Sequence, residues 1–299
     1  MSPLTASLPA ASGFSWNIAA DLRQMLAYEF MRNAFEAGAV VSVVAGVVGY
    51  FVILRRNAFA AHALSHIGFA GAAGAVMISV APVWGLLAFC LGSGAAIGAI
   101  GQKLRARDTA IGIVLTFSLG LGSLFLALYN GQADEVTSIL FGQISGVSPS
   151  QVLLTVVIGA LAVGLIGAVY RPLLFASVDE DVARARGVPV RALSIGFVMI
   201  LALVVAVSVQ VVGVLLIFAL TVTPAAAADV VSRSPRQAMA IGVAIALAST
   251  WLAIFISWYS GKWPASFFIT SISTAIYVVL RVAKWLSERR LLRQSRLSA

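Results

Sequence analysis

The two histidines of this chain, His62 and His66, are four residues apart at the mouth of an apolar segment. Residues i and i+4 of an α-helix share one face, with Cβ atoms about 5–6 Å apart. Two imidazoles in this arrangement can bind one borderline transition-metal ion such as Zn²⁺. Ionisable side chains at membrane depth are costly and mark substrate pathways. The spacing therefore predicts metal ligands on a translocation path, or else a helix-end pair hydrated at the level of the lipid headgroups.

The composition is that of a membrane protein. The chain has 299 residues, of which 61% are apolar and 10% are charged, and its mean hydropathy is +1.00. A soluble domain carries about 25% charged residues. Several apolar runs reach the ~18–20 residues that cross a bilayer. We therefore expect an all-α, polytopic transmembrane helical bundle, with the single cysteine, Cys90, packed in it as a small hydrophobe.

Basic residues orient the expected helices. The net charge of +9 is spread over short loops between apolar runs, which follows the positive-inside rule and does not indicate a nucleic-acid surface. This bias predicts an outside N-terminus and a cytoplasmic C-terminus. We divide the chain into an extracytoplasmic or interfacial segment (1–34), a transmembrane permease domain (35–285) and a basic cytoplasmic tail (286–299). The nine expected spans are 35–54, 65–81, 83–102, 109–129, 151–170, 191–209, 211–228, 238–258 and 265–283.

Two places leave more than one interpretation open. Residues 1–34 either cross the membrane or lie on it. The apolar stretch from 192 to 228 is too long for one crossing, because a single helix of that length would extend for about 55 Å. It forms either a plain hairpin or a broken, re-entrant half-helix.

The most informative polar loop runs from residue 177 to residue 189. Ser177 and Glu180 have the spacing of a capping box, and Gly187 can end a helix. Acidic residues fall in the first turn and basic ones in the last, which suits the helix dipole. We expect a cytoplasmic surface helix of about nine residues, which is either a docking helix for a partner or a solvated connector. Its defining residues are Ser177, Asp179, Glu180, Asp181, Arg184 and Gly187.

Several short motifs follow one another in a familiar order. Arg55-Arg56 precedes Ala61-His-Ala-Leu-Ser-His66, and Asp108-Thr-Ala-Ile-Gly-Ile-Val114, Ile139-Leu-Phe-Gly142 and a Gly-to-Pro-Ala-Ala segment over 212–226 come later. In this order the chain resembles the permease subunits of ABC importers for zinc, manganese and iron, over about residues 30–285.

The resemblance implies a fold like that of type II ABC importers in a bacterial cytoplasmic membrane. It implies a divalent transition-metal ion (zinc, manganese or iron) as transported substrate, with no permanently bound cofactor. The implied partners are a separate cytoplasmic ABC ATPase seated on the 177–190 helix, an extracytoplasmic metal-binding protein, a second permease copy and membrane lipid, but no nucleic acid. The chain has no Gly-x-x-x-x-Gly-Lys-Ser/Thr phosphate loop and is therefore a transporter subunit rather than an enzyme.

One departure from the family pattern bears on the choice of metal. His62 stands where the family usually has Asp. A His/His pair shifts preference toward Zn²⁺, Ni²⁺ or Co²⁺ and away from Mn²⁺. The identity of the metal and the remaining ligands of the site stay open.

Four further residues are candidates for the pathway. Pro224 interrupts the hydrogen bonding of an expected helix, and Thr221 and Thr223 can re-satisfy its backbone. The alternative is a purely structural kink. Asp108 is either a helix N-cap or an ion-exit residue.

The sequence argues against one rival function and leaves two others open. An intramembrane metalloprotease would need Glu at position 63 between the histidines, and the chain has Ala63. A permease for a metal chelate such as cobalamin or a siderophore, and a membrane scaffold without transport, remain as alternatives.

Overall fold

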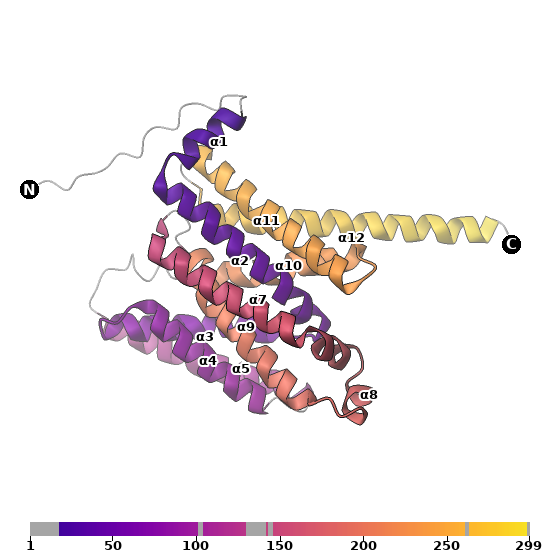
Figure 1. Cartoon of the computed structure of the whole chain (residues 1–299), viewed down its shortest axis with the longest axis horizontal. Helices are drawn as coiled ribbons and strands as arrows, with labels where there is room; N and C mark the ends of the chain where they lie inside the picture. Colours follow the sequence, from indigo (N-terminus) through magenta and orange to yellow (C-terminus); the bar gives the residue numbers. More distant parts are fainter. Residues whose placement is uncertain (1–17, 101–103, 130–141, 143–145, 261–262, 298–299) are drawn as a thin grey trace, which may run out of the picture.

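The computed structural model describes residues 18–100, 104–129, 142, 146–260 and 263–297, and it is a bundle of helices (Figure 1). Each of the nine expected spans contains a helix, which confirms the fold class. Within the described residues, seven helices are long and apolar enough to cross a membrane, and Pro82–Gly98 and Leu216–Val231 are shorter apolar segments. The helices of the described residues are α1 (Ile18–Leu26), α2 (Glu29–Leu54), α3 (Ala58–Met77), α4 (Pro82–Ile100), α5 (Leu104–Leu128), α7 (Pro149–Val178), α8 (Glu180–Ala185), α9 (Val190–Val212), α10 (Val214–Val231), α11 (Pro235–Ser260) and α12 (Ala265–Leu297).

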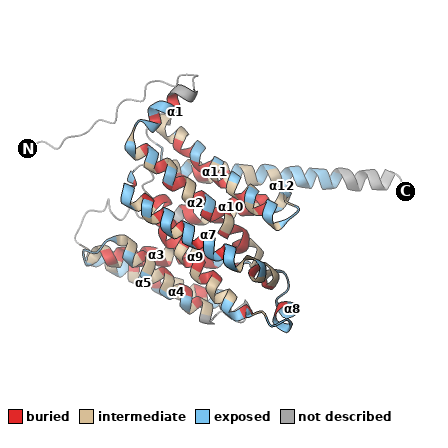
Figure 2. Ribbon diagram, in the orientation of Figure 1, coloured by how far each residue is buried: buried red, intermediate tan, exposed pale blue. Residues whose placement is uncertain are grey.

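Three helices form the centre of the bundle. The most apolar windows of α2, α3 and α9 are 67–72% buried, whereas those of α5, α7, α11 and α12 are 17–33% buried. Figure 2 shows the same division, with buried residues gathered inside and exposed ones along the outer helices. The helix that carries both histidines is therefore a central one, flanked by α4 and α5 (Figure 1).

Glycines allow the closest helix contacts around α3. A Cβ atom on Gly71 would lie 2.7 Å from the Cβ of Phe89 and closer still to the carbonyl oxygen of Gly85 on α4. A Cβ on Gly85 would in turn collide with the Gly71 carbonyl. Helices in lipid associate largely through such close packing of small residues. The α3–α4 contact therefore holds the histidine-bearing helix in place.

The long apolar stretch from 192 to 228 is broken in the interior of the protein. α9 ends and α10 begins at Gly213, whose φ of 92° lies in the region that favours glycine. Val212 and Val214 on either side are at most 1% exposed. Gly142 covers this break, since a Cβ there would lie 2.6 Å from the Gly213 nitrogen. The structure therefore has a broken helix with a buried turn rather than a plain surface hairpin, and residues 139–141 of the neighbouring motif lie outside the described residues.

Several helices extend beyond the expected spans. α2 begins at Glu29, before the expected domain start at 35, and α7 continues through Pro172 to Val178. α12 continues to Leu297, so the expected basic tail is helical as far as that residue. Residues 284–297 contain neither Gly nor Pro and are rich in Leu and Arg, which favour helix. Hydropathy marks where a helix is apolar and not where its hydrogen bonding ends.

Candidate functional site: a histidine pair on a central helix

The two histidines face one another on α3. Their ring centroids are 4.6 Å apart, in an edge-to-face arrangement with an interplanar angle of 75°. Both side chains are half-buried in a helix whose other residues are mostly buried. The i, i+4 spacing thus brings the two imidazoles together, as the sequence predicts.

Neighbouring helices fix the surroundings of the pair. The ring of Phe218 on α10 lies 5.0 Å from that of His62, measured between centroids. The Ser65 hydroxyl donates to the His62 carbonyl at 2.7 Å, and the buried Cys90 thiol on α4 lies 3.4 Å from the Leu64 carbonyl. Cys90 is fully buried, as expected of a small packed hydrophobe. The pair is therefore enclosed by protein on its α10 side.

The arrangement supplies two ligand nitrogens. Within the described parts of the chain, no group of three or more His, Cys, Asp or Glu side chains is placed to hold a metal ion. A closed structural zinc site has four protein ligands, whereas a site that must release its ion keeps positions for water or substrate groups. Two imidazoles on one helix face suit transient binding of a divalent ion.

The predicted threonines lie on α10 after Phe218, and the backbone of Thr221 packs against Gly49 of α2. Thr221 is 1% exposed and its hydroxyl has no hydrogen-bond partner, although it is surrounded by protein. Thr223 is half-buried, and Pro224 is buried inside α10. An unpaired buried hydroxyl costs free energy unless a ligand or water completes it. Among the pathway candidates on α10, Thr221 is therefore the one whose buried hydroxyl lacks a hydrogen-bond partner.

Asp108 does not cap its helix. α5 already begins at Leu104, so Asp108 lies inside the helix, and its side chain is exposed. The expectation of an N-cap is wrong because residues 104–107 adopt helical geometry before it. Its assignment to an ion exit remains a prediction.

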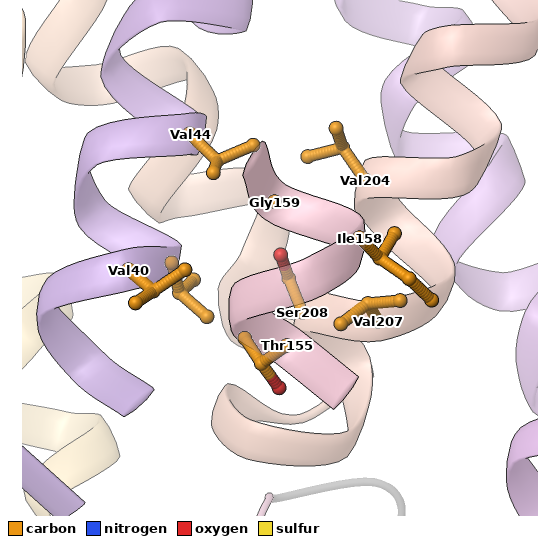
Figure 3. A pocket seen from close by; sticks show the side chains of 9 residues that line it. Val40, Val44, Thr155, Ile158, Gly159, Val204, Val207 and Ser208 are labelled. Carbon is orange, nitrogen blue, oxygen red and sulfur yellow. The ribbon is translucent and has the colours of Figure 1, made fainter. Parts of the chain in front are cut away.

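A small cavity lies away from the histidine pair, among α2, α7 and α9 (Figure 3). Valines form most of its wall, and Thr155 and Ser208 contribute the hydroxyls drawn in the figure. The Thr155 hydroxyl already donates to the Gln151 carbonyl at 2.7 Å. None of the predicted site residues lines this cavity, and hydroxyls alone are poor ligands for a transition metal.

The loop after α7 contains the expected short helix, α8, but its capping differs from the prediction. Asp179 is the N-cap, and its carboxylate accepts from the Val182 N–H at 3.0 Å. Ser177 lies in the last turn of α7, where its hydroxyl donates to the Leu173 carbonyl. The predicted Ser177–Glu180 capping box is therefore wrong, because α7 extends further than expected and takes Ser177 into its own hydrogen bonding.

The rest of α8 follows the sequence more closely. Glu180 pairs with Arg184 one turn on, at 2.8 Å and in solvent. Asp181 is exposed in the first turn, and Gly187, with a φ of 79°, ends the segment. The helix has six residues instead of about nine, since Arg186 already lies in the following turn.

Two residues near the site were missed from the sequence. Phe218 contacts His62 across more than 150 positions of chain, and an apolar residue in an apolar run gives no signal of such a contact. Arg55 contributed only to the orientation of the spans and to the Arg55-Arg56 motif, yet its guanidinium donates to one serine of α7 and one of α9. The half-burial of the Arg55 side chain at the end of α2 would have indicated that it contacts other helices, but burial cannot be read from a single sequence.

Comparison with known proteins gives consistent matches. The profile of the ABC 3 transport family matches residues 27–284. The manganese transport system membrane protein MntC of Halalkalibacterium halodurans is 32% identical over 179 residues, which is 60% of this chain and 61% of that protein. The chain thus spans less than two thirds of the length of the curated relatives that it matches, 61–64% for the first four.

Solved structures match over more of the chain. The structure of PsaBC from Streptococcus pneumoniae in complex with Fab is similar with a TM-score of 0.78 and 30% identity, over 88% of this chain and 95% of that chain. A structure assigned to a metal-chelate type ABC transporter in an inward-facing conformation has a TM-score of 0.72 at 16% identity, over 88% and 89% of the two chains. The second likeness concerns the fold alone.

Proposed function

Because the chain belongs to the ABC 3 transport family, we propose that it is the permease of a bacterial ABC importer that moves a divalent transition-metal ion across the cytoplasmic membrane. ATP hydrolysis then belongs to a separate cytoplasmic subunit. An extracytoplasmic binding protein delivers the ion, as expected for a chain that itself supplies few ligands. Its N-terminus lies outside and its C-terminus in the cytoplasm, following the distribution of Lys and Arg.

The paired imidazoles on α3 carry this proposal. They lie 4.6 Å apart between centroids on one of the three most buried helices, where unpaired ionisable groups are costly. His62 and His66 bind the ion in transit, and Thr221 on α10 offers its unpaired hydroxyl along the same path. Thr223, Pro224 and Asp108 are weaker pathway candidates, because none of them has an unmet buried polar atom.

α8 is proposed as the docking element for the ATPase. Val178 and Val182 are 73% and 43% exposed, although both are apolar and lie at the end of the bundle that carries α8 (Figure 1). Acidic side chains surround them in the first turn of α8. Apolar anchors with a charged rim are what a protein partner can cover. A cytoplasmic connector with no partner would expose them to water.

A second copy of the chain is proposed to pack against α5. Gly112 and Gly120 on this helix have no atom within 4 Å of the position that a Cβ would take. Ile113 and Phe117 beside them are 65% and 67% exposed. Small residues spaced in this way along a membrane helix allow another helix to approach closely. Lipid covers the remaining outer faces, such as that of α7.

Metal uptake tests the proposal. In cells without their own importers, co-expressed with the ATPase and binding protein, the chain should restore uptake of at least one divalent first-row metal. Combined His62→Ala and His66→Ala should abolish uptake while membrane insertion and ATPase association persist. Phe59→Leu, a change at an exposed position of the same helix, is the matched control and should transport normally.

Other outcomes separate the rival functions. Uptake of a metal chelate that survives in the double alanine variant would identify a chelate permease. Correct insertion with no uptake of either free or chelated metal would support the membrane scaffold as the function. Normal metal uptake by the double alanine variant would show that the histidine pair is structural.

A further inference from the structure

Arg55 joins three helices at the end of the bundle that carries α8. It is the C-cap residue of α2. Its Nη1 donates to the Ser177 hydroxyl at 3.0 Å and its Nη2 to the Ser194 hydroxyl at 2.6 Å. The guanidinium carbon also lies 5.7 Å from the centroid of the buried Phe197 ring on α9. Ser177 lies in the last turn of α7 and Ser194 near the start of α9, so one side chain bridges the two helices that flank α8.

The segment around α8 has a small core of its own. Ala176, Ala183 and Val190 are buried together, and partly buried neighbours pack against them. This cluster is distinct from the main core of the bundle, and Leu193 belongs to both. The end of α7, α8 and the start of α9 therefore behave as one packed unit, which we call the α8 unit (residues 175–194). Arg55 attaches this unit to α2.

The turn after Arg55 is short and hydrogen-bonded. The Asn57 N–H donates to the Val52 carbonyl at 2.8 Å, and the Asn57 carbonyl accepts from the Ala61 N–H at 3.0 Å. Asn57 is 2% exposed, and Arg56 has a φ of 54°, which fixes a tight reversal. Only Arg56 and Asn57 therefore separate Arg55 from the first turn of α3. His62 lies in the next turn of that helix.

Arg55 and its neighbour Arg56 carry the same charge in different surroundings. Arg56 is exposed, as suits a residue that only biases topology. Arg55 is half-buried, and its two serine partners are 122 and 139 residues away in sequence. The Ser177 hydroxyl in turn donates to the Leu173 carbonyl, so its oxygen is oriented to accept from Arg55. A planar guanidinium presents separate nitrogens to two acceptors in a fixed geometry, whereas a lysine offers a single nitrogen on a flexible stem.

We infer that Arg55 is a positioning residue that ties the α8 unit to the first turn of α3, so that movement of α8 is transmitted to the helix bearing the histidine pair. The inference rests on the proposed function, in which α8 receives the motion of the ATPase and α3 holds the ion. It adds a mechanical connection between those two sites.

The first test needs neither transport nor a partner. Hydrogen exchange of the chain in nanodiscs should show faster exchange in both the α8 unit and the first turn of α3 for Arg55→Gln. Arg56→Gln removes the same charge from the neighbouring position and should leave both regions unchanged. Unchanged exchange at the first turn of α3 in Arg55→Gln would overturn the connection, whatever the cargo of the protein.

The second test measures coupling in liposomes that contain the permease with its ATPase. Arg55→Gln should retain ATPase association and hydrolysis but lower the number of metal ions moved per ATP by about tenfold, within the range usual for coupling between distant sites. Ser177→Ala and Ser194→Ala should each give part of this loss and add little to Arg55→Gln, and Arg55→Lys should fall in between. A wild-type ratio in Arg55→Gln would refute the role in coupling.

The two tests separate this inference from the proposed function. If the wild-type complex moves no metal ion, the proposed function fails and the exchange experiment alone decides on the connection. If the wild type transports and Arg55→Gln loses ATPase association together with activity, Arg55 maintains only the α8 surface and the inference is wrong.

Discussion

Replacing Gly71 by alanine tests the close approach of α3 and α4. The new Cβ would lie 2.7 Å from the Cβ of Phe89 and nearer still to the backbone carbonyl of Gly85. A backbone atom cannot rotate away, so the two helices must separate by roughly 1 Å. A gap of that size forfeits about a quarter to a half of the attraction of each contact that it opens. Overpacking of this kind costs about 1–3 kcal/mol, and we expect the upper half of that range.

Gly164 provides the matched control for this change. It lies within α7, and a Cβ there would meet no atom within 4 Å. Gly→Ala in a helix is itself favourable by up to about 1 kcal/mol, and this gain is common to both variants. The difference in stability between Gly71→Ala and Gly164→Ala therefore isolates the clash.

Thermal unfolding in nanodiscs measures this difference, with the folded fraction determined by size-exclusion chromatography after heating. Gly71→Ala should unfold several degrees below Gly164→Ala, since about 1 kcal/mol corresponds to roughly 2–4 °C for chains of 150–250 residues. Metal uptake should fall as well, because His66 lies five residues away on the displaced helix. Equal unfolding temperatures for the two variants would refute the backbone contact between α3 and α4.

Three further predictions concern the metal, the ATPase and the second copy. His62→Asp should keep uptake and shift preference toward Mn²⁺ or Fe²⁺, because a carboxylate is the harder ligand; competition between metals measures this, and an unchanged order of preference would contradict it. Combined Glu180→Lys and Asp181→Lys should abolish co-purification of the ATPase without loss of folded permease, since the exposed ion pair removed contributes only about 0–1 kcal/mol; normal association would make α8 a mere connector. Gly112→Leu should reduce the number of permease copies per complex, measured by native mass spectrometry, whereas Gly164→Leu should not; equal copy numbers would place the second copy elsewhere.

Much of the architecture was predictable because a bilayer imposes a simple rule on composition. Long apolar runs must be helical there, since the backbone has no other hydrogen-bond partners. The ends of the helices were not predictable in the same way. Ser177 carried a plausible capping pattern, but α7 continued past it and Asp179 took the role of the cap. Local capping patterns compete with one another, and the choice depends on packing of the whole segment.

Within the candidate site, only the contact between two residues of the same helix was predictable from the sequence. His62 and His66 could be paired because helical spacing is a local property. Phe218 and Arg55 could not be found, because their partners are brought close only by the packing of distant helices. The unpaired hydroxyl of Thr221 could not be predicted either, because it depends on how the surrounding helices bury this side chain.

The buried break at Gly213 constrains how the nascent chain enters the bilayer. The residues on both sides of it are buried in protein, so this turn meets neither lipid nor bulk water in the finished protein. We therefore expect α9 and α10 to enter the bilayer together, as one apolar unit whose break at Gly213 packs against protein. Gly142, which closes over the turn, is translated first and can receive it. A bulky side chain at position 142 would thus leave mature-length protein with this unit unseated, a defect of biogenesis rather than of transport.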